Sequence, residues 1–477
     1  MDETALKSTE TVRHEVDLIG GMDIPSKYYY GIQTLRARDN FQISRSKLSY
    51  YPELISALAI VKQSAALANR ELGLLDDNIT EAIVKACEDI RAGKLHEHFV
   101  VDMMQGGAGT STNMNANEVI ANLALEYLGK EKGQYEYCHP NNHVNLSQST
   151  NDAYPTALRI ALYNSLGNMI APLQHLIDAL RSKAVEFADI LKMGRTQLQD
   201  AVPMTLGQEF EAFAFILEEE IARLREAQKL LLVHNMGATA IGTGINADPR
   251  YTEICSRYLA EVSGLETVPA SNLIAATSDT GDFVSSSAHL KRLAVKLSKI
   301  CNDLRLLSSG PRAGLQEINL PPMQPGSSIM PGKVNPVIPE VVNQIAFKVI
   351  GNDVAITMAA EAGQLQLNVM EPLIIYNLLE SIEMLTNGIV TLTDKCIVGI
   401  SANTEVCRDL VLQSIGLVTA LNPYLGYEKS TLLAAEALRT GRGIYELVRE
   451  QNLLSPEELE DVLRPENMVR PRSINTM

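Results

Sequence analysis

The sequence lacks closely paired cysteines and long apolar runs. None of its six cysteines forms a C-x-x-C pair, and no stretch approaches the roughly 18 consecutive apolar residues of a membrane span. Cysteines dispersed along 477 residues are typical of free, buried thiols in a reducing compartment. The N-terminus, Met1-Asp2-Glu3-Thr4, is acidic and is followed by no apolar segment. We therefore expect a cytoplasmic protein that does not enter a membrane.

Basic residues are in the minority. The chain has 41 Lys and Arg against 57 Asp and Glu, which gives a net charge of −16. This balance argues against a nucleic-acid partner, because affinity for nucleic acids comes from neutralised phosphates. An anionic ligand would have to be attracted by a local positive site, since the field of the whole protein opposes it.

Several site motifs are also missing. The sequence has no G-x-S-x-G elbow and no H-E-x-x-H, and its glycine-rich segment 106–109 lacks the Gly-Lys-Ser/Thr ending of a phosphate-binding loop. The segment 242–247 fits G-x-G-x-x-A, but a long charged helix is expected before it instead of a strand, so we interpret it as an interhelical loop. The histidines of 96–98 and 138–143 match no ligand spacing. We predict no metal site and no cofactor, and activation by Mg²⁺ stays open.

Helical spacing of apolar residues dominates the chain. From Leu206 to Leu231, for example, apolar residues fall at 206, 210, 213, 217, 221, 224 and 231. Such patterns predict five long helices, over 156–187, 206–231, 290–307, 337–362 and 373–400, and shorter helices over 52–72, 78–92 and about 115–128. We therefore predict a mainly α protein with a central long five-helix bundle. Its expected parts are an N-terminal mostly helical domain (1–150), the bundle (151–405) and a small C-terminal helical domain (406–477).

Four polar loops interrupt these helices, at 105–115, 147–152, 193–200 and 326–335. The second is expected to begin a helix, with Asn151 or Asp152 as its cap. The fourth begins Gly326-Ser327-Ser328 and contains prolines and glycines that a helix or strand interior does not tolerate.

The composition of the loops indicates what they could bind. All four are rich in Ser, Thr, Asn and Gln, whose hydroxyls and carboxamides can donate to carboxylate oxygens, and Lys333 adds positive charge. The same residue types favour helix caps, so one such loop would indicate only a cap. Four of them, one with a lysine, favour a site for a small dianionic ligand.

Taken together, the four loops resemble those of the fumarase/aspartase superfamily, and most closely its aspartase branch. The matching segments are Gly106–Thr110, Ser147–Asp152, Gly194–Asp200 and the superfamily signature Gly326–Asn335. The resemblance implies a three-domain helical subunit and a homotetramer with a twenty-helix core, in which each active site takes loops from three subunits. It also implies reversible removal of ammonia from L-aspartate to give fumarate.

The resemblance assigns roles to individual positions. It implies that Ser327 is the base that takes the C3 proton. It implies that Lys333 and Asn335 hold the α-carboxylate. The β-carboxylate is expected to be held by Thr110, Ser149, Thr150 and Ser328. The amino group is expected to face Asn151, Thr196 and Gln197.

The chemistry explains why such residues are needed. Removal of the C3 proton adds a second negative charge to a carboxylate, so donors must point at the oxygens of the resulting enediolate. A serine is a weak base, and we expect backbone N–H groups of its loop, with Lys333 nearby, to lower its pKa. Fumarases of the superfamily have His where this chain has Gln197. Because Gln cannot titrate and an ammonium group already carries its proton, Gln197 favours amine elimination over hydration.

Two other functions remain open at this point. One is a fumarate hydratase that acts on L-malate with the same fold and base. The other is a non-catalytic helical assembly protein in which the polar loops have no catalytic role.

Overall fold

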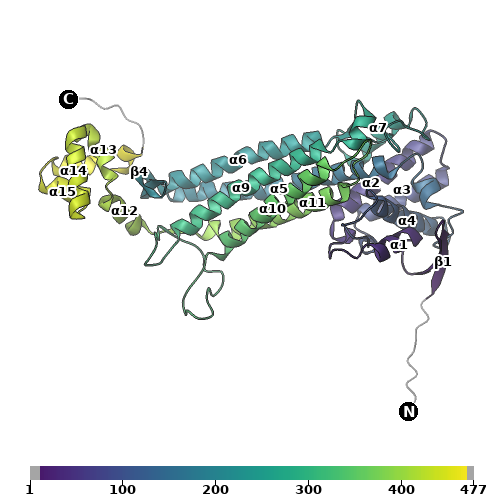
Figure 1. Ribbon diagram of the computed structural model, residues 1–477, viewed down its shortest axis with the longest axis horizontal. Helices are drawn as coiled ribbons and strands as arrows, with labels where there is room; N and C mark the ends of the chain where they lie inside the picture. Colours follow the sequence, from purple (N-terminus) through teal and green to yellow (C-terminus); the bar gives the residue numbers. More distant parts are fainter. Residues whose placement is uncertain (1–10, 470–477) are drawn as a thin grey trace, which may run out of the picture. The chain divides into compact units, whose positions relative to one another are not determined.

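The computed structural model describes residues 11–469, which are mostly helical, so the predicted mainly α class is confirmed (Figure 1). Backbone contacts divide this part of the chain into two compact units. Unit 1 comprises the described residues of Met1–Met169 with Arg223–Lys291 and Lys348–Glu383, and unit 2 comprises Ile170–Ala222, Arg292–Phe347 and the described residues of Met384–Met477. The predicted division into three consecutive domains stays a prediction.

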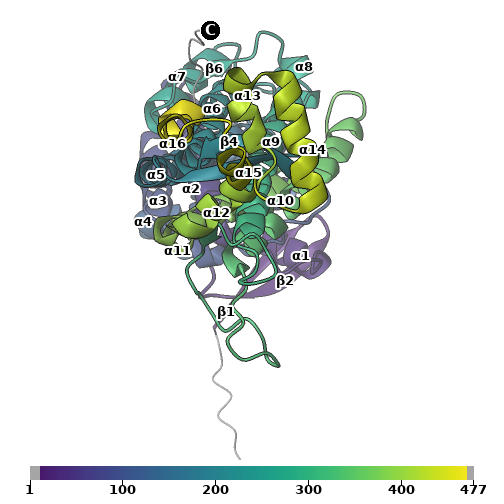
Figure 2. The same cartoon turned by 90° about the vertical axis from the view of Figure 1, so that its left-hand side faces the viewer.

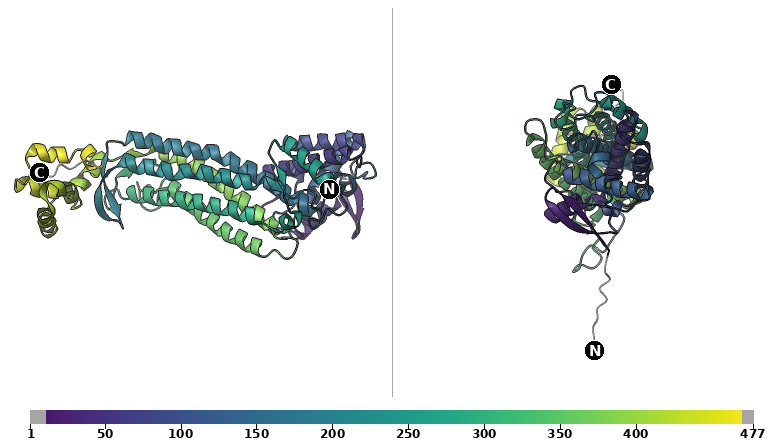
Figure 3. Two further views of the ribbon diagram at one scale, coloured as in Figure 1. Left: turned by 90° about the horizontal axis from the view of Figure 1, so that it is seen from above. Right: turned by 90° about the vertical axis from the view of Figure 1, so that its right-hand side faces the viewer.

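Five long helices contribute a segment to each unit. They are α5 (Thr150–Glu186), α6 (Leu206–Leu230), α9 (Gly281–Leu307), α10 (Val337–Glu361) and α11 (Glu371–Lys395). Within each unit their segments run side by side (Figures 1 and 3), which confirms the predicted long five-helix bundle. The predicted starts of α5 and α9 were too late, and the predicted end of α11 was too late as well.

Apolar residues at helical spacing form the core of the bundle. On α6, Phe210, Phe213, Leu217 and Leu224 are all buried, as the spacing in the sequence indicated. Polar pairs between neighbouring helices lie among them. In unit 1 the Ser287 hydroxyl of α9 donates to the Asp353 carboxylate of α10 at 2.8 Å. Because buried polar groups need partners, such pairs restrict how the helices can slide past one another.

Besides its segments of the five long helices, unit 1 contains several shorter elements. They are β1 (Val12–Asp17), β2 (Gly20–Pro25), α1 (Ile32–Asn40), α2 (Pro52–Glu71), α3 (Asp77–Arg91), α4 (Thr110–Tyr127), β5 (Val233–His234), α7 (Tyr251–Ser263), β6 (Val268–Pro269) and α8 (Leu273–Ser278), with single turns at Leu48–Tyr50, His96–His98 and Pro140–Val144. Helix α2 packs against α3 and α7. Helix α4 begins at Thr110, so the predicted start at 115 was wrong.

Unit 2 carries a hairpin and a group of short helices. The hairpin consists of β3 (Leu191–Thr196) and β4 (Gln199–Thr205), where the sequence had predicted only a loop. The other elements are β7 (Ile318–Asn319), a turn at Ile397–Gly399, β8 (Ser401–Ala402), α12 (Thr404–Gln413), α13 (Leu417–Leu425), α14 (Tyr427–Thr440), α15 (Ile444–Glu450), α16 (Pro456–Val462) and α17 (Pro465–Met468). Helices α13 and α14 pack side by side (Figure 2). Residues 470–477 of the predicted C-terminal domain lie outside the described residues.

One stretch within residues 11–469, Glu371–Gly399, is long and apolar enough to cross a membrane by length and composition. Its most apolar window is 56% buried inside the fold, which is typical of a core helix. The sequence predicted a long helix over 373–400 but no membrane span, because its apolar residues are interrupted by polar ones.

The buried carboxylate of Glu118, on α4, holds the start of α1. Its Oε2 atom accepts hydrogen bonds from the Gly31 N–H at 2.8 Å, the Thr34 N–H at 3.0 Å and the Thr34 hydroxyl at 2.5 Å, while Oε1 accepts from the Gln33 N–H at 2.8 Å. A carboxylate that only accepts suits four converging donors, and it satisfies N–H groups that a helix start leaves unpaired.

We expect Glu118→Gln to destabilise the protein by about 1–3 kcal/mol, because its amide would place a donor against other donors. Burial raises the pKa of Glu118 to about 7, so urea unfolding at about pH 9, where the carboxylate is ionised, measures this change. The matched control is Glu88→Gln on the exposed face of α3, which should stay within about 0.5 kcal/mol of the wild type. Equal stability of the two variants would contradict the anchoring role of Glu118.

Candidate active site

The four predicted loops are divided between the two units. Residues 105–115 and 147–152 belong to unit 1, whereas residues 193–200 and 326–335 belong to unit 2.

In unit 1 the two predicted loops meet at the N-termini of α4 and α5. Gly109, with φ +89°, directly precedes Thr110, and a Cβ atom on it would lie 2.3 Å from the Tyr154 ring, so only glycine fits. The Asn113 carboxamide of α4 donates to the Thr150 hydroxyl of α5 at 3.2 Å. Thr110 and Thr150 therefore begin two adjacent helices, where the helix dipole favours negative charge.

Ser149, and not Asn151 or Asp152, caps α5, so the predicted cap was wrong. The Ser149 hydroxyl accepts from the Asn151 N–H at 3.2 Å, and the Ser149 N–H donates to the Asp152 carboxylate at 2.9 Å. This is a reciprocal arrangement in which two terminal N–H groups are satisfied. The other Asp152 oxygen accepts from the Thr239 N–H at 2.9 Å, and burial raises the pKa of Asp152 to about 6.

Asn151 is held on both sides by a neighbouring loop. Its side-chain nitrogen donates to the Ala240 carbonyl at 2.8 Å, and its own carbonyl accepts from the Asn235 carboxamide at 3.0 Å. The first bond orients the Asn151 carboxamide and the second holds its backbone, which leaves the side-chain oxygen as an acceptor that a cationic group could reach.

A buried lysine lies beneath the 147–152 loop and was missed in the sequence. The Lys62 ammonium, on α2, donates to the Asn145 and Gln148 side-chain oxygens, each at 2.9 Å. Asn145 also accepts from Asn113, the residue that contacts Thr150. The available signal was a single lysine inside the apolar pattern of 52–72, which is unusual unless the charge has buried partners.

In unit 2 the predicted residues Thr196 and Gln197 lie at the tip of the β3–β4 hairpin. Thr196 pairs with Gln199, so Gln197 and Leu198 form a two-residue turn. Their φ angles are +53° and +61°, in the left-handed region that costs most residues other than glycine about 1–2 kcal/mol each. Strain of this kind persists only where the surrounding structure holds it, and it is common at functional sites.

The fourth predicted loop closes on itself through its ends. The Gly326 N–H donates to the Lys333 carbonyl at 2.8 Å, and the Asn335 carboxamide donates to the Gly326 carbonyl at 2.5 Å. This brings Ser327, Ser328, Lys333 and Asn335 into one short, largely exposed loop between α9 and α10, seen in Figure 1.

Ser327 is the best organised hydroxyl of this loop. Its oxygen accepts from the Ile329 N–H at 3.2 Å and from the Met330 N–H at 2.9 Å. Two backbone donors aimed at one hydroxyl oxygen would also stabilise negative charge on that oxygen.

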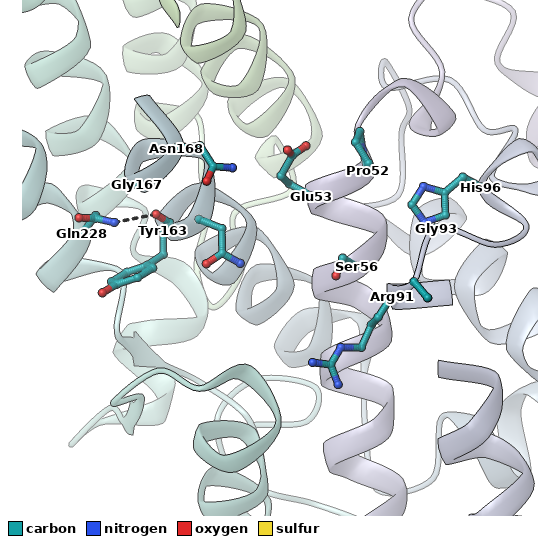
Figure 4. A pocket seen from close by; sticks show the side chains of 12 residues that line it. Pro52, Glu53, Ser56, Arg91, Gly93, His96, Tyr163, Gly167, Asn168 and Gln228 are labelled. Atoms are coloured by element: carbon teal, nitrogen blue, oxygen red, sulfur yellow. Dashed lines mark hydrogen bonds between the residues drawn. The ribbon is translucent and has the colours of Figure 1, made fainter. Parts of the chain in front are cut away.

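A cavity of about 580 Å³ in unit 1 is separate from the predicted residues (Figure 4). It is lined by Pro52, Glu53, Ser56, Arg91, Ala92, Gly93, His96, Tyr163, Asn164, Gly167, Asn168 and Gln228. The Arg91 guanidinium is already engaged by Gln63 and the Val262 carbonyl. Among residues 11–469 we also find no group of three or more His, Cys, Asp or Glu side chains placed to hold a metal ion.

Comparison with known proteins identifies relatives over nearly the whole chain. The family described as "Lyase" matches residues 20–351, and the family described as "Fumarase C C-terminus" matches residues 417–470. The aspartate ammonia-lyase of Pseudomonas aeruginosa is 63% identical over 97% of this chain and 98% of its own. The aspartate ammonia-lyase of Escherichia coli is 54% identical over 97% of each chain.

Solved structures agree with these sequence matches. A crystal structure from Brucella melitensis, described as fumarate lyase:delta crystallin bound to cobalt, has a TM-score of 0.94 and 54% identity, and the match covers 97% of this chain and 100% of that one. The class II fumarase of Schistosoma mansoni has a TM-score of 0.91 at 36% identity, with the same coverage.

The titration of Lys62 can be observed through stability. Burial lowers the pKa of this lysine from 10.5 to about 7, although nearby Asp152 opposes the shift. Between these two pKa values Lys62 binds more protons in the unfolded chain than in the folded one, so the free energy of unfolding rises with pH. We expect the free energy of unfolding of the wild type to rise relative to that of Lys62→Met between about pH 7 and pH 9.

Urea unfolding at several pH values measures this difference. The control is Lys85→Met, which removes an exposed lysine of α3 and should give a difference from the wild type that does not change with pH. A constant offset for Lys62→Met as well would contradict a lowered pKa.

Proposed function

This chain belongs to the fumarase/aspartase superfamily of lyases, and we propose that it removes ammonia from L-aspartate to give fumarate. The family match bears out the resemblance seen in the four loops, and relatives named aspartate ammonia-lyase cover almost the whole chain. The observation that carries the proposed chemistry is the Ser327 oxygen, which accepts from two backbone N–H groups of its own loop.

Ser327 is the base in this proposal. Its alkoxide takes the C3 proton. Before this transfer the Ser327 oxygen is negatively charged, and the N–H groups of Ile329 and Met330 stabilise that charge. The Lys333 ammonium belongs to the same closed loop and favours the same ionised form. Ile329 and Met330 are largely exposed, so closure of the loop over a substrate would bury apolar surface and exclude water.

When the C3–H bond breaks, its electron pair stays on the substrate. The substrate becomes an enediolate with two negative charges on the β-carboxylate. Thr110, Ser149, Thr150 and Ser328 provide the donors for these oxygens. Thr110 and Thr150 begin adjacent helices, so backbone N–H groups and hydroxyls can act on the same anion. Donors held in place before the reaction need no reorganisation when the charge develops.

The carbon–nitrogen bond then breaks, and its electron pair leaves with nitrogen as neutral ammonia. Lys333 and Asn335 hold the α-carboxylate. The amino group faces Asn151, Thr196 and Gln197, where the Asn151 side-chain oxygen accepts from the ammonium. Gln197 cannot donate an ionisable proton, which suits a leaving group that needs no general acid.

We also propose that the protein is a cytoplasmic homotetramer whose active sites take loops from three subunits. The exposed apolar residues of α10 support an assembly. Phe347, Val354 and Met358 are 62%, 56% and 67% exposed and lie on one face of the helix, at spacings of seven and four residues. A helix face of this kind needs a partner, and a second copy of the bundle has matching faces.

Incubation of the purified protein with L-aspartate, followed by measurement of fumarate absorbance, tests the reaction. We expect fumarate from L-aspartate, with ammonia released in equal amount. Fumarate from L-malate alone would indicate the hydratase, and no product from either substrate would indicate a non-catalytic assembly protein.

The assignment of the base is tested by Ser327→Ala. We expect kcat to fall by about 10²–10⁴-fold with KM little changed, because the variant loses proton transfer and keeps the carboxylate contacts. Ser308→Ala, outside the loop, is the matched control and should retain activity. Near-normal turnover by Ser327→Ala would show that Ser327 is not the base.

A further inference from the structure

A buried group of four charged side chains lies along β3 of the β3–β4 hairpin in unit 2. The Arg195 guanidinium contacts the Glu317 carboxylate at 3.0 Å, and the Lys192 ammonium contacts the other Glu317 oxygen at 3.3 Å and Glu209 at 2.6 Å. The side chains of Glu317, Lys192 and Arg195 are 0%, 3% and 14% exposed. Two cations and two carboxylates balance, so no charge in the group is left uncompensated.

These charges join two segments that carry proposed site residues. Arg195 directly precedes Thr196 and Gln197 on β3. Glu317 directly precedes β7, on the segment that continues into the 326–335 loop, and its backbone carbonyl accepts from the Asn403 N–H at 2.9 Å. Because Glu317 is fixed by both its backbone and its neighbours, it is a rigid point against which the hairpin can be held.

The hairpin needs such an anchor because its tip is strained. Gln197 and Leu198 both have positive φ, and the strand register shifts between Met193 and Arg195. On the other strand, the Ser414 hydroxyl donates to the Asp200 carboxylate at 2.6 Å. The turn is therefore tethered on each side by a polar contact with a different segment of unit 2, Arg195 on β3 and Asp200 on β4.

We propose that Arg195 and Glu317 are positioning residues that hold Thr196 and Gln197 in the orientation that the reaction requires. This inference rests on the proposed function, in which these two side chains face the substrate amino group. Arg195 does not touch the substrate. Its guanidinium sets the twist of β3 just before the turn, and a small displacement there moves the Gln197 side chain away from the leaving group.

A double-mutant cycle tests the proposal with L-aspartate as substrate. We expect Arg195→Gln to lower kcat/KM by about 10- to 100-fold in the wild-type background. In the background Thr196→Ala/Gln197→Ala, the same substitution should lower it by less than about threefold, because the groups it positions are already gone. A residue that only stabilises the fold would cause the same fold-loss in both backgrounds, and that result would overturn the proposal.

Two further variants keep the test decisive. Arg195→Lys retains the charge and one donor, and we expect its kcat/KM to exceed that of Arg195→Gln by at least about threefold. Glu317→Gln keeps the shape of the partner and replaces Arg195→Gln in the cycle if that variant does not fold. The control is Arg442→Gln, which breaks an exposed pair with Glu450 on another part of unit 2 and should stay within about twofold of the wild type.

The outcomes separate the two hypotheses. A wild type that forms no fumarate from L-aspartate overturns the proposed function, and this inference falls with it. A wild type that is active, with equal losses in both backgrounds, overturns only the positioning role of Arg195 and Glu317.

Discussion

A helix cannot begin without partners for its first backbone N–H groups, and this requirement places the polar residues of the molecule. Ser149 caps α5 and Gly109 allows α4 to start against Tyr154, so Thr110 and Thr150 lie at adjacent helix ends. The residue types that satisfy helix ends are also donors for carboxylates. Capping and anion binding therefore do not exclude each other, and the loops can serve both.

The helices could be predicted from the sequence because their apolar spacing is regular, and α2, α6 and α10 begin within a residue of the expected positions. The start of α5 could not be predicted, because Ser, Asn and Asp are all good caps. Only the structure shows which of these side chains accepts from which N–H. The β3–β4 hairpin was missed for a different reason. Its turn is Gln197-Leu198, and neither residue is typical of positive φ.

The candidate site residues were chosen by residue type and resemblance, whereas the buried residues that support their loops were not identified from the sequence. Lys62 and Glu317 are far in sequence from the 147–152 and 193–200 loops that they hold, so even an unusual lysine in an apolar pattern does not reveal its partners. The 326–335 loop and the tip of the β3–β4 hairpin are largely exposed, whereas the loops of unit 1 are mostly buried or half-buried. A buried polar group supports a loop in each unit, Lys62 in unit 1 and the Arg195–Glu317 pair in unit 2, and hydrogen bonds are strongest where water is excluded.

This arrangement also resolves the conflict between an acidic protein and a proposed substrate that carries two carboxylates. A net charge of −16 repels the substrate at long range, but salt screens that field beyond about 8–10 Å. At the proposed site the Lys333 ammonium, the N-termini of α4 and α5 and the loop amides act at short range, where salt screens their attraction for carboxylates far less.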